Sequence, residues 1–343
     1  MIKKYKAIAV HLIVFVMLPV LLLTLPGCSA EQAKTTRTLF IMDTHVDITF
    51  YSSSVQVAQT AIGEIFTEMQ RLESLLSRHI AGSDLQRINE AAGREPVQVS
   101  PETLFVLRRA LEIAALSDGA FDPTIAPLLE LWGFGGESFA VPSADQLAQA
   151  RELVNYRVVE IDEEQGSVFL PRSGMKLDLG GIAKGYIVDK GQELARGSVS
   201  ASFINAGGDI SIRGRKPSGD AWRVAVQDPH DPQRWVAVIN MDEGSVVTSG
   251  DYQRFFEVEG RRYHHILDPH TGMPAFGLSS VTIVAPDTTT ADALATAVFV
   301  LGEEKGMALV ESLPNVDALI VDNNGKLLIS SGLEGQVEVL QGQ

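Results

Sequence analysis

Two oxygen-bearing side chains, Asp292 and Thr296, lie four positions apart in a run of small residues, Thr290–Ala297, that is typical of a helix. Residues at this spacing project from one helical face. A carboxylate and a hydroxyl are hard ligands that suit Mg²⁺ or Ca²⁺ when a backbone carbonyl or a phosphate completes the shell. The same pair also fits an acid that complements the helix dipole and a threonine bonded to its own helix. The spacing alone leaves both interpretations open.

A glycine-rich stretch, Asp178-Leu179-Gly180-Gly181-Ile182-Ala183-Lys184-Gly185, follows an expected strand and opens an expected helix. Paired glycines let the backbone turn tightly, and the free N–H groups of a helix start can receive an anion. Lys184 adds a positive charge suited to a phosphate. The spacing matches neither the P-loop nor the dinucleotide-binding pattern. The alternative is a tight strand-to-helix turn with a solvated lysine.

Histidines gather late in the chain, where His264 and His265 are adjacent. On a strand these two side chains face opposite ways, so one can be buried while the other faces solvent. A zinc site is not indicated, because the histidines lack ligand spacing and the chain has one cysteine. Ser249 lacks the context of a hydrolase nucleophile.

The amino terminus has the pattern of a targeting segment. Three lysines precede an apolar run over 7–25, and Cys28 follows Leu25-Pro26-Gly27. This junction resembles a bacterial lipobox, in which the cysteine is lipidated; an uncleaved transmembrane anchor is the alternative. We expect a signal peptide over 1–27, a tether over 28–36 and one domain over 37–343. The prediction is an extracytoplasmic membrane lipoprotein at the periplasmic face of the inner membrane, although Ser29 leaves the choice of membrane open.

The composition excludes several classes of protein. Apolar residues make up 45% and charged residues 21% of the 343 residues, values that are typical of a globular chain. A net charge of −15 argues against nucleic-acid binding, which needs a basic surface. A single cysteine excludes a disulfide framework, a zinc–thiolate site and an iron–sulfur cluster.

The elements that must position these residues are mixed in order, which favours an α+β domain with a mixed, mostly antiparallel sheet and flanking helices. Apolar spacing predicts a long helix over Val55–Arg78. From Lys176 onward strands dominate, and Asn324-Gly325 predicts a type I′ hairpin turn. Expected strands include 176–179, 202–204, 210–213, 222–227, 235–240, 255–259, 264–267 and 280–285, and expected helices include 100–119, 143–154, 182–196, 290–301 and 305–313.

Taken in order, several stretches resemble the ApbE family of FAD:protein FMN transferases, over about residues 36 to 335. They are Met42-Asp43-Thr44, Leu76–His79, Ser83–Asn89, Gly119–Thr124, Leu131–Gly135, Asp178–Gly185, Asn205–Asp209, Thr248–Tyr252, His264–Gly272 and Ala291–Thr296. Members of this family bind FAD, use Mg²⁺ at the pyrophosphate, and transfer FMN to a threonine or serine of a partner protein with release of AMP. Such partners include subunits of redox-driven ion pumps.

The resemblance also implies roles for individual residues. Asp292, Thr296 and the carbonyl of Gly181 would hold the metal, and His265 would lie near the acceptor hydroxyl. The residues that would line the FAD site are Met42, His79, Ala120, Phe121, Asp122, Asp178, Lys184 and Ile266. Phe121 and Trp132 would pack near the flavin, although Trp132 fits a core role equally well.

This chain departs from the family pattern at two places. Asp43 stands where the family often has glycine, and His79 stands where it often has tyrosine. Both positions concern flavin contacts. Two alternatives accompany the transferase interpretation: an Mg²⁺-dependent FAD pyrophosphatase that uses water as acceptor, and a flavin-binding lipoprotein without catalysis.

Overall fold

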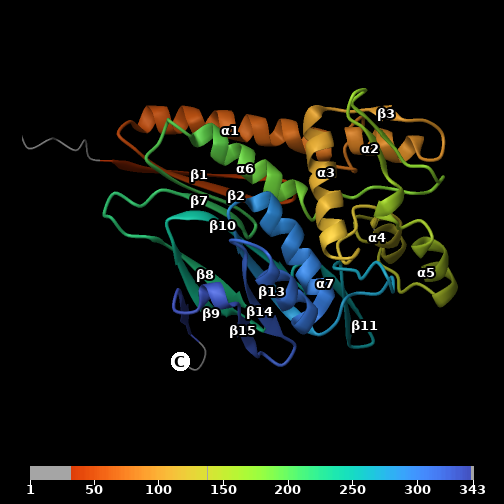
Figure 1. Cartoon of the computed structure of the whole chain (residues 1–343). Helices are drawn as coiled ribbons and strands as arrows, with labels where there is room; N and C mark the ends of the chain where they lie inside the picture. Colours follow the sequence, from red (N-terminus) through yellow and green to blue (C-terminus); the bar gives the residue numbers. More distant parts are fainter. Residues whose placement is uncertain (1–31, 137, 341–343) are drawn as a thin grey trace, which may run out of the picture. The chain divides into compact units, whose positions relative to one another are not determined.

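The computed structural model describes residues 32–136 and 138–340. Its centre is an eight-stranded antiparallel sheet (Figure 1) with the order β1-β2-β6-β7-β10-β13-β14-β15. The strands are β1 (Ala33–Ile41), β2 (Thr44–Ser52), β6 (Ala201–Ala206), β7 (Asp209–Arg213), β10 (Glu243–Gly250), β13 (Leu278–Ala285), β14 (Asp317–Asp322) and β15 (Leu327–Ile329). The α+β expectation is confirmed.

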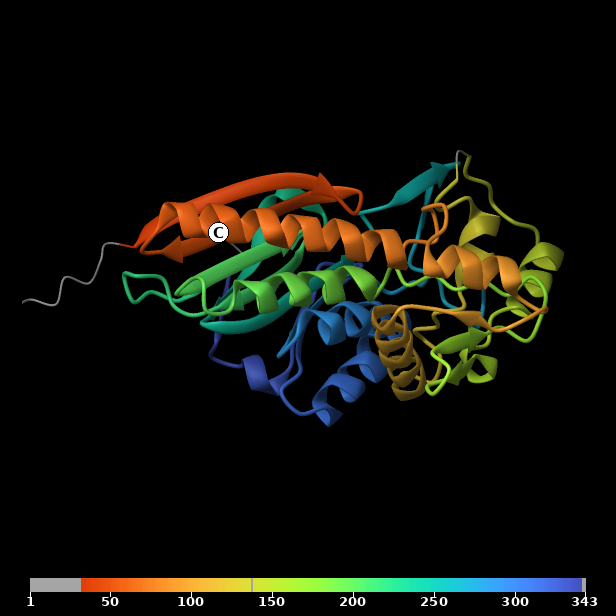
Figure 2. The same cartoon turned by 90° about the horizontal axis from the view of Figure 1, so that it is seen from above.

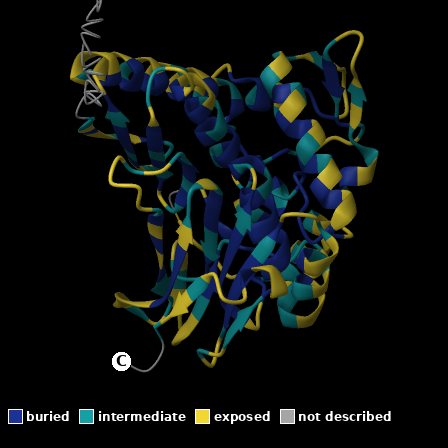
Figure 3. Cartoon of the chain, turned by 60° about the vertical axis from the view of Figure 1, so that its left-hand side comes forward, coloured by how far each residue is buried: buried dark blue, intermediate teal, exposed yellow. Residues whose placement is uncertain are grey.

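Three helices cover one face of this sheet: α1 (Val55–Leu76), α6 (Ala183–Ala195) and α7 (Thr288–Ser312). They lie side by side in Figure 2. In α1 the apolar residues from Ala58 to Leu76 recur every three or four positions and face the core, whereas Val55 and Val57 in the first turn are exposed. Ser54 caps the helix by accepting the N–H of Val57. Figure 3 shows buried residues where helices and sheet meet and exposed residues on the outer helix faces. This layer holds most of the hydrophobic core.

A second, three-stranded sheet, of order β16-β9-β8, packs on the other face of the central sheet. Its strands are β8 (Trp222–Asp228), β9 (Asp231–Met241) and β16 (Val337–Val339). Successive side chains of a strand point to opposite faces of the sheet, so each strand of the central sheet contributes to both apolar layers. In β7, Ile212 joins this second apolar layer, whereas Asp209 and Ser211 face the helices.

The remaining elements gather at one end of the sheet (Figure 1). Trp132 is buried in a small cluster there, and its Nε1–H donates to the carbonyl of Gly272 over 2.8 Å, so Trp132 has the core role. The elements are α2 (Asp84–Ala91), β3 (Val97–Gln98), α3 (Pro101–Leu116), α4 (Ala126–Trp132), α5 (Ala144–Arg151), a 3₁₀ turn at Tyr156–Val158, β4 (Glu160–Asp162), β5 (Ser167–Phe169), β11 (Phe255–Val258) and β12 (Arg261–His264). A second 3₁₀ turn, Ser331–Leu333, lies beside β14.

Several expected boundaries were wrong. Residues 176–179 form no strand, because the N–H of Leu177 donates to the side chain of Asn89 and that of Asp178 donates to Pro123. The strand expected over 264–267 ends at His264. The helices expected over 290–301 and 305–313 are parts of α7, which has a non-helical residue at Gly302 with φ 79° and ψ −177°.

Two further differences concern a turn and the domain boundary. The β14–β15 turn is not type I′, since only Gly325 of the Asn-Gly pair has a positive φ. Strand β1 begins at Ala33, inside the expected tether 28–36, and pairs with β2 from its first residue. The expected signal peptide and Cys28 lie outside the described residues. Within the described ranges, no helix is long and apolar enough to cross a membrane.

Candidate active site

The glycine-rich stretch places α6 against α7. A Cβ atom on Gly185 would lie 2.3 Å from the carbonyl oxygen of Thr288 and 2.9 Å from Cβ of Asp292, so only glycine fits this contact. The backbone N–H of Gly185 donates to Oδ2 of Asp292 over 3.0 Å. Asp292 is therefore held by the start of α6, the helix that carries Lys184.

The other two metal-ligand candidates, Gly181 and Thr296, meet at the same place. A Cβ atom on Gly181 would lie 3.3 Å from Oγ1 of Thr296 and 3.2 Å from the ring of Phe121. Thr296 lies one helical turn after Asp292 on α7, as the spacing predicts. Gly181, Asp292 and Thr296 are thus neighbours, with Phe121 beside them.

Lys184 is paired with a carboxylate that sequence reasoning did not assign to the site. Its Nζ donates to Oδ1 of Asp209 over 2.6 Å, and the side chain of Asp209 is only 1% exposed. Burial raises the pKa of Asp209 in spite of Lys184. Burial opposes the charge of Lys184, yet Asp209 and Asp292 together raise the pKa of its ammonium.

The charges of this group do not balance. Asp209 and Asp292 supply two carboxyls against the single ammonium of Lys184. Burial and then the nearby Asp209 raise the pKa of Asp292 well above its usual value. Oδ2 of Asp209 is buried and accepts no N–H group or hydroxyl of the described residues, and the carboxyl of Asp209 lies beside that of Asp292. A hard divalent cation beside Asp292 fits this arrangement, because it would offset the excess negative charge.

The cation would have mixed ligands rather than a cluster of acids. In the part of the chain that the structure describes, no three His, Cys, Asp or Glu side chains form a metal-binding group. The expected ligand set does not require such a group. It has one carboxylate, that of Asp292, together with the hydroxyl of Thr296 and the backbone carbonyl of Gly181.

Arg78 ties Asp178 to the neighbouring loops. Its Nε donates to Oδ2 of Asp178 over 2.5 Å, and its Nη2 donates to the carbonyl of Phe134 over 3.3 Å. His79 packs on Gly135, where a Cβ atom would lie 2.8 Å from the imidazole. Burial and then Arg78 lower the pKa of His79.

Met42 lies in the β1–β2 turn, where Met42 and Asp43 have φ values of 54° and 56°. The N–H of Met42 donates to Oε1 of Glu73 over 3.0 Å, which fixes the turn against α1. Asp43 contributes to the electrostatic environment of His79, so this turn and His79 are near one another.

Both carboxylate oxygens of Asp122 accept hydrogen bonds from groups of the protein itself. One oxygen accepts the N–H and hydroxyl of Thr124, and the other accepts the N–H of Tyr156. Ala120, Phe121 and Ile266 are also buried. The expected flavin contacts of Ala120, Asp122 and Ile266 would therefore involve the backbone, and Asp122 stabilises the loop that carries Phe121.

The two adjacent histidines differ, as expected, although His265 lies just after β12 rather than within it. His264 is 4% exposed, and its Nε2–H donates to the carbonyl of Ala275 over 2.8 Å. His265 is half-buried, and its Nδ1 contacts the carbonyl of Arg254 over 3.2 Å. Burial lowers the pKa of both imidazoles to about 4.

The structure thus joins Gly181, Lys184, Asp292 and Thr296 in one group, while Arg254 contributes to the electrostatic environment of both His79 and His265. Asp209 and Arg78 were missed from the sequence. Asp209 ends the stretch Asn205–Asp209, which is also consistent with a simple turn. The only feature that could have indicated a role for Asp209 was its place after two glycines at the start of a strand.

Comparisons with known proteins show the family of this chain. The ApbE family model matches residues 42–320. A FAD:protein FMN transferase of Treponema pallidum is 38% identical over 92% of this chain and 91% of the relative. One of Klebsiella pneumoniae is 38% identical over 78% of this chain and 84% of the relative.

Solved structures extend the likeness to three dimensions. The ApbE protein of Thermotoga maritima has a TM-score of 0.83 and 38% identity, covering 89% of this chain and 99% of its own. The apo flavinyl transferase ApbE of Pseudomonas stutzeri has a TM-score of 0.79 and 31% identity, covering 89% of this chain and 97% of its own. The chain described here belongs to the ApbE family.

Proposed function

We propose that this chain transfers FMN from FAD to a threonine or serine hydroxyl of a partner protein, with Mg²⁺, and releases AMP. Family membership and the names of the relatives support flavin transfer. The observation that carries the proposal is the meeting of two contacts at the glycine turn: Lys184 bonds to Asp209 over 2.6 Å, and the N–H of Gly185 bonds to Asp292 over 3.0 Å. This group combines a cation for a phosphate with an oxygen-rich place for a metal.

Gly181, Asp292 and Thr296 would hold Mg²⁺, which when bound supplies positive charge against the pyrophosphate. Lys184 lies beside these residues and adds a second charge for the same phosphates. Phosphoryl transfer depends mainly on such positioning and charge neutralisation. Asp209 fixes the ammonium of Lys184, so that it does not need to be ordered during the reaction.

In the proposed step, the acceptor hydroxyl oxygen bonds to the phosphorus of the FMN half of FAD. The bond from that phosphorus to the bridging oxygen breaks, and AMP leaves with this oxygen and its electron pair. The hydroxyl proton passes to Nε2 of His265. Because Nδ1 donates its proton to the carbonyl of Arg254, the lone pair of the neutral imidazole is on Nε2. The product is a phosphodiester between FMN and the acceptor.

The test incubates the protein with FAD and Mg²⁺, with and without an acceptor peptide that contains threonine. A covalent, fluorescent peptide adduct and free AMP are expected. Free FMN and AMP without an adduct would instead indicate a pyrophosphatase, and intact FAD would indicate a binding protein. Addition of EDTA should abolish the adduct, and an adduct formed at the same rate in EDTA would contradict the metal part of the proposal.

We also propose that Cys28 anchors the domain to a membrane outside the cytoplasm, at the periplasmic face of the inner membrane. The lipobox-like junction before this only cysteine supports the anchor. The acceptor is then a membrane-associated protein on the same side, such as a subunit of a redox pump. Metabolic labelling with a fatty acid should mark the wild type and not Cys28→Ser, and label on the variant would refute the anchor.

A further inference from the structure

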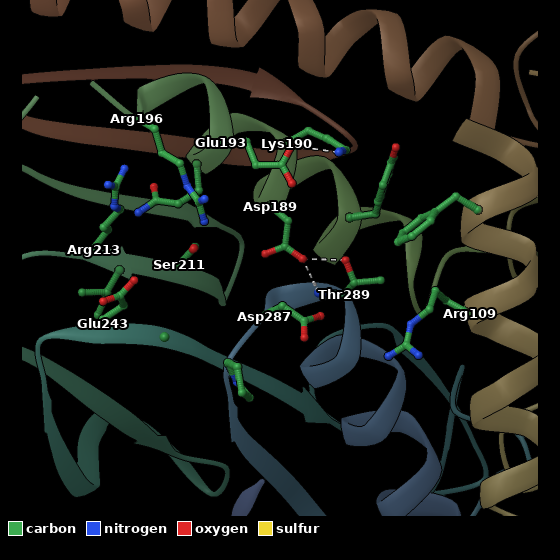
Figure 4. A pocket seen from close by; sticks show the side chains of 16 residues that line it. Arg109, Asp189, Lys190, Glu193, Arg196, Ser211, Arg213, Glu243, Asp287 and Thr289 are labelled. Carbon is green, nitrogen blue, oxygen red and sulfur yellow. Dashed lines mark hydrogen bonds and ion pairs between the residues drawn. The ribbon is translucent and has the colours of Figure 1, made fainter. Parts of the chain in front are cut away.

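Asp189 joins α6 to the first turn of α7. Its Oδ1 accepts the backbone N–H of Thr288 over 2.8 Å, and its Oδ2 accepts the N–H and the hydroxyl of Thr289 over 2.8 and 2.5 Å. Asp189 and Thr289 both line a cleft of about 440 Å³, and Figure 4 shows their side chains pointing toward each other and joined by a hydrogen bond. The cap residue of α7 itself, Asp287, accepts the next N–H, that of Thr290, and the hydroxyl of the same threonine. Two of the first free N–H groups of α7 are therefore satisfied by another helix.

A second contact between the same helices lies one turn away. Gly185 precedes Asp189 by four residues on α6, so both face α7. Gly185 packs against the carbonyl of Thr288 and donates its N–H to Asp292. A single contact would leave the helices free to pivot. Two contacts one turn apart fix the rotation and the register of one helix against the other.

The hydrogen bonds from the first turn of α7 to Asp189 are called the clamp here. The clamp affects the site because α6 carries Lys184 and α7 carries Asp292. The residue before α6 is Ile182, whose side chain cannot accept an N–H group, so the start of α6 depends on its neighbours for its position. Any slide of α7 along α6 would change the distance between the N–H of Gly185 and Asp292.

We infer that Asp189 is a positioning residue for the cation site, which holds Asp292 in register with Gly185 and Lys184 by clamping the first turn of α7 to α6. The effect on the cation rests on the proposed function, whereas the effect of Asp189 on the contact between α6 and α7 does not. The clamp lies outside the site, and the residues that line its cleft include none of those assigned to FAD or metal.

The test compares two isosteric substitutions in the full chain. Asp189→Asn removes one negative charge near the start of α7 and also replaces one acceptor of the clamp with an NH₂ group. Asp287→Asn removes one negative charge at the same helix end but keeps the cap, since asparagine caps a helix as well as aspartate does. The two variants are thus matched in charge, and each replaces one carboxylate acceptor with an NH₂ group, in the clamp for Asp189→Asn and in the cap for Asp287→Asn.

Two measurements decide the outcome. Amide hydrogen exchange at Gly185, without metal or flavin, should be at least about tenfold faster in Asp189→Asn and within about twofold of wild type in Asp287→Asn. Calorimetric titration with Mg²⁺ should give a roughly tenfold higher Kd for Asp189→Asn, in the range that supporting residues of metal sites show. Wild-type exchange and Kd in Asp189→Asn, or equal changes in both variants, would overturn the inference.

The two arms separate the inference from the proposed function. If wild type binds no Mg²⁺, the proposed metal fails, whereas exchange at Gly185 still decides the clamp. If Asp189→Asn does not fold, Thr289→Val removes only the hydroxyl bond and keeps both N–H bonds. Exchange at Gly185 should then rise several-fold, and an unchanged rate in Thr289→Val would count against the clamp.

Discussion

Nδ1 of His265 lies 3.2 Å from the backbone carbonyl oxygen of Arg254, which also accepts the backbone N–H of His265 over 3.1 Å. A carbonyl oxygen only accepts hydrogen bonds, so Nδ1 carries the proton and Nε2 keeps its lone pair. His264 has the opposite arrangement, since its Nε2–H donates to Ala275 and its Nδ1 is buried. The backbone therefore leaves Nε2 of His265 with the lone pair that the proposed proton transfer requires, whereas His264 is held inside the fold.

Replacement of His265 by alanine should slow FMN transfer by ~10²–10⁴-fold, the usual contribution of a general base, and leave FAD affinity near wild type. Flavin fluorescence measures the affinity, and formation of the peptide adduct measures the rate. His264→Ala is the control, because loss of a buried side chain should lower stability more than rate. A His265→Ala variant that binds FAD far more weakly but transfers normally at saturation would assign His265 to binding.

The pH dependence of transfer should reflect the lowered pKa of His265. Burial, followed by Arg254, lowers this pKa from 6.5 to about 4. A base works in its unprotonated form, so the rate should show no loss near pH 6.5 and should fall only as the pH approaches 4. The rate at saturating FAD and Mg²⁺ between about pH 5 and 8 is the measurement. A half-maximal rate at pH 6.5 that disappears in His265→Ala would contradict this assignment.

Much of the helical layer was predictable because its signals are local. The apolar spacing of residues 55–78 defines the buried stripe of α1 to within two residues at its end. The glycines at 180 and 181 mark the turn before α6, which begins at Ala183. Asp292 and Thr296 share one face of α7 as their spacing requires, since helical periodicity does not depend on the rest of the fold.

The unpredicted features depend on contacts between distant segments. Asp209 is 25 residues from Lys184 in sequence, and nothing near either residue indicates the ion pair. Residues 176–179 have the composition of a strand, but the side chain of Asn89 and the carbonyl of Pro123 take their N–H groups. Tertiary hydrogen bonds thus override a weak local preference.

Asp292→Ala should lower the transfer rate at least about tenfold at low Mg²⁺, because loss of a hard ligand weakens the metal site. Raising the Mg²⁺ concentration should restore part of the rate if the loss is one of affinity. Asp287→Asn on the same helix provides the control and should keep the wild-type Mg²⁺ dependence. Near wild-type rates for Asp292→Ala at low Mg²⁺ would remove Asp292 from the ligand set.

Asp43→Gly should stabilise the protein, because Asp43 has a φ of 56° in a turn whose two central residues are both left-handed. Relief of this strain should exceed the entropy that glycine adds to the unfolded chain, for a gain on the order of 0.5 kcal/mol. Urea unfolding measures the change. Ser53→Gly, at a position without a positive φ, should give no gain, and equal gains in both variants would exclude backbone strain as the cause.

Lys184→Ala should weaken FAD binding and slow transfer, and it should also destabilise the fold. Its loss leaves the carboxylate of Asp209 buried without its partner, which typically costs about 3–5 kcal/mol. In an Asp209→Asn background the same substitution should cost less by about 0.5–3 kcal/mol, since the neutral amide does not need the ammonium. Urea unfolding of the four proteins gives this coupling, and fluorescence titration gives the FAD affinity of each. Additive stabilities would show that the pair does not stabilise the site, and an unchanged FAD affinity in both Lys184→Ala proteins would remove Lys184 from the flavin contacts.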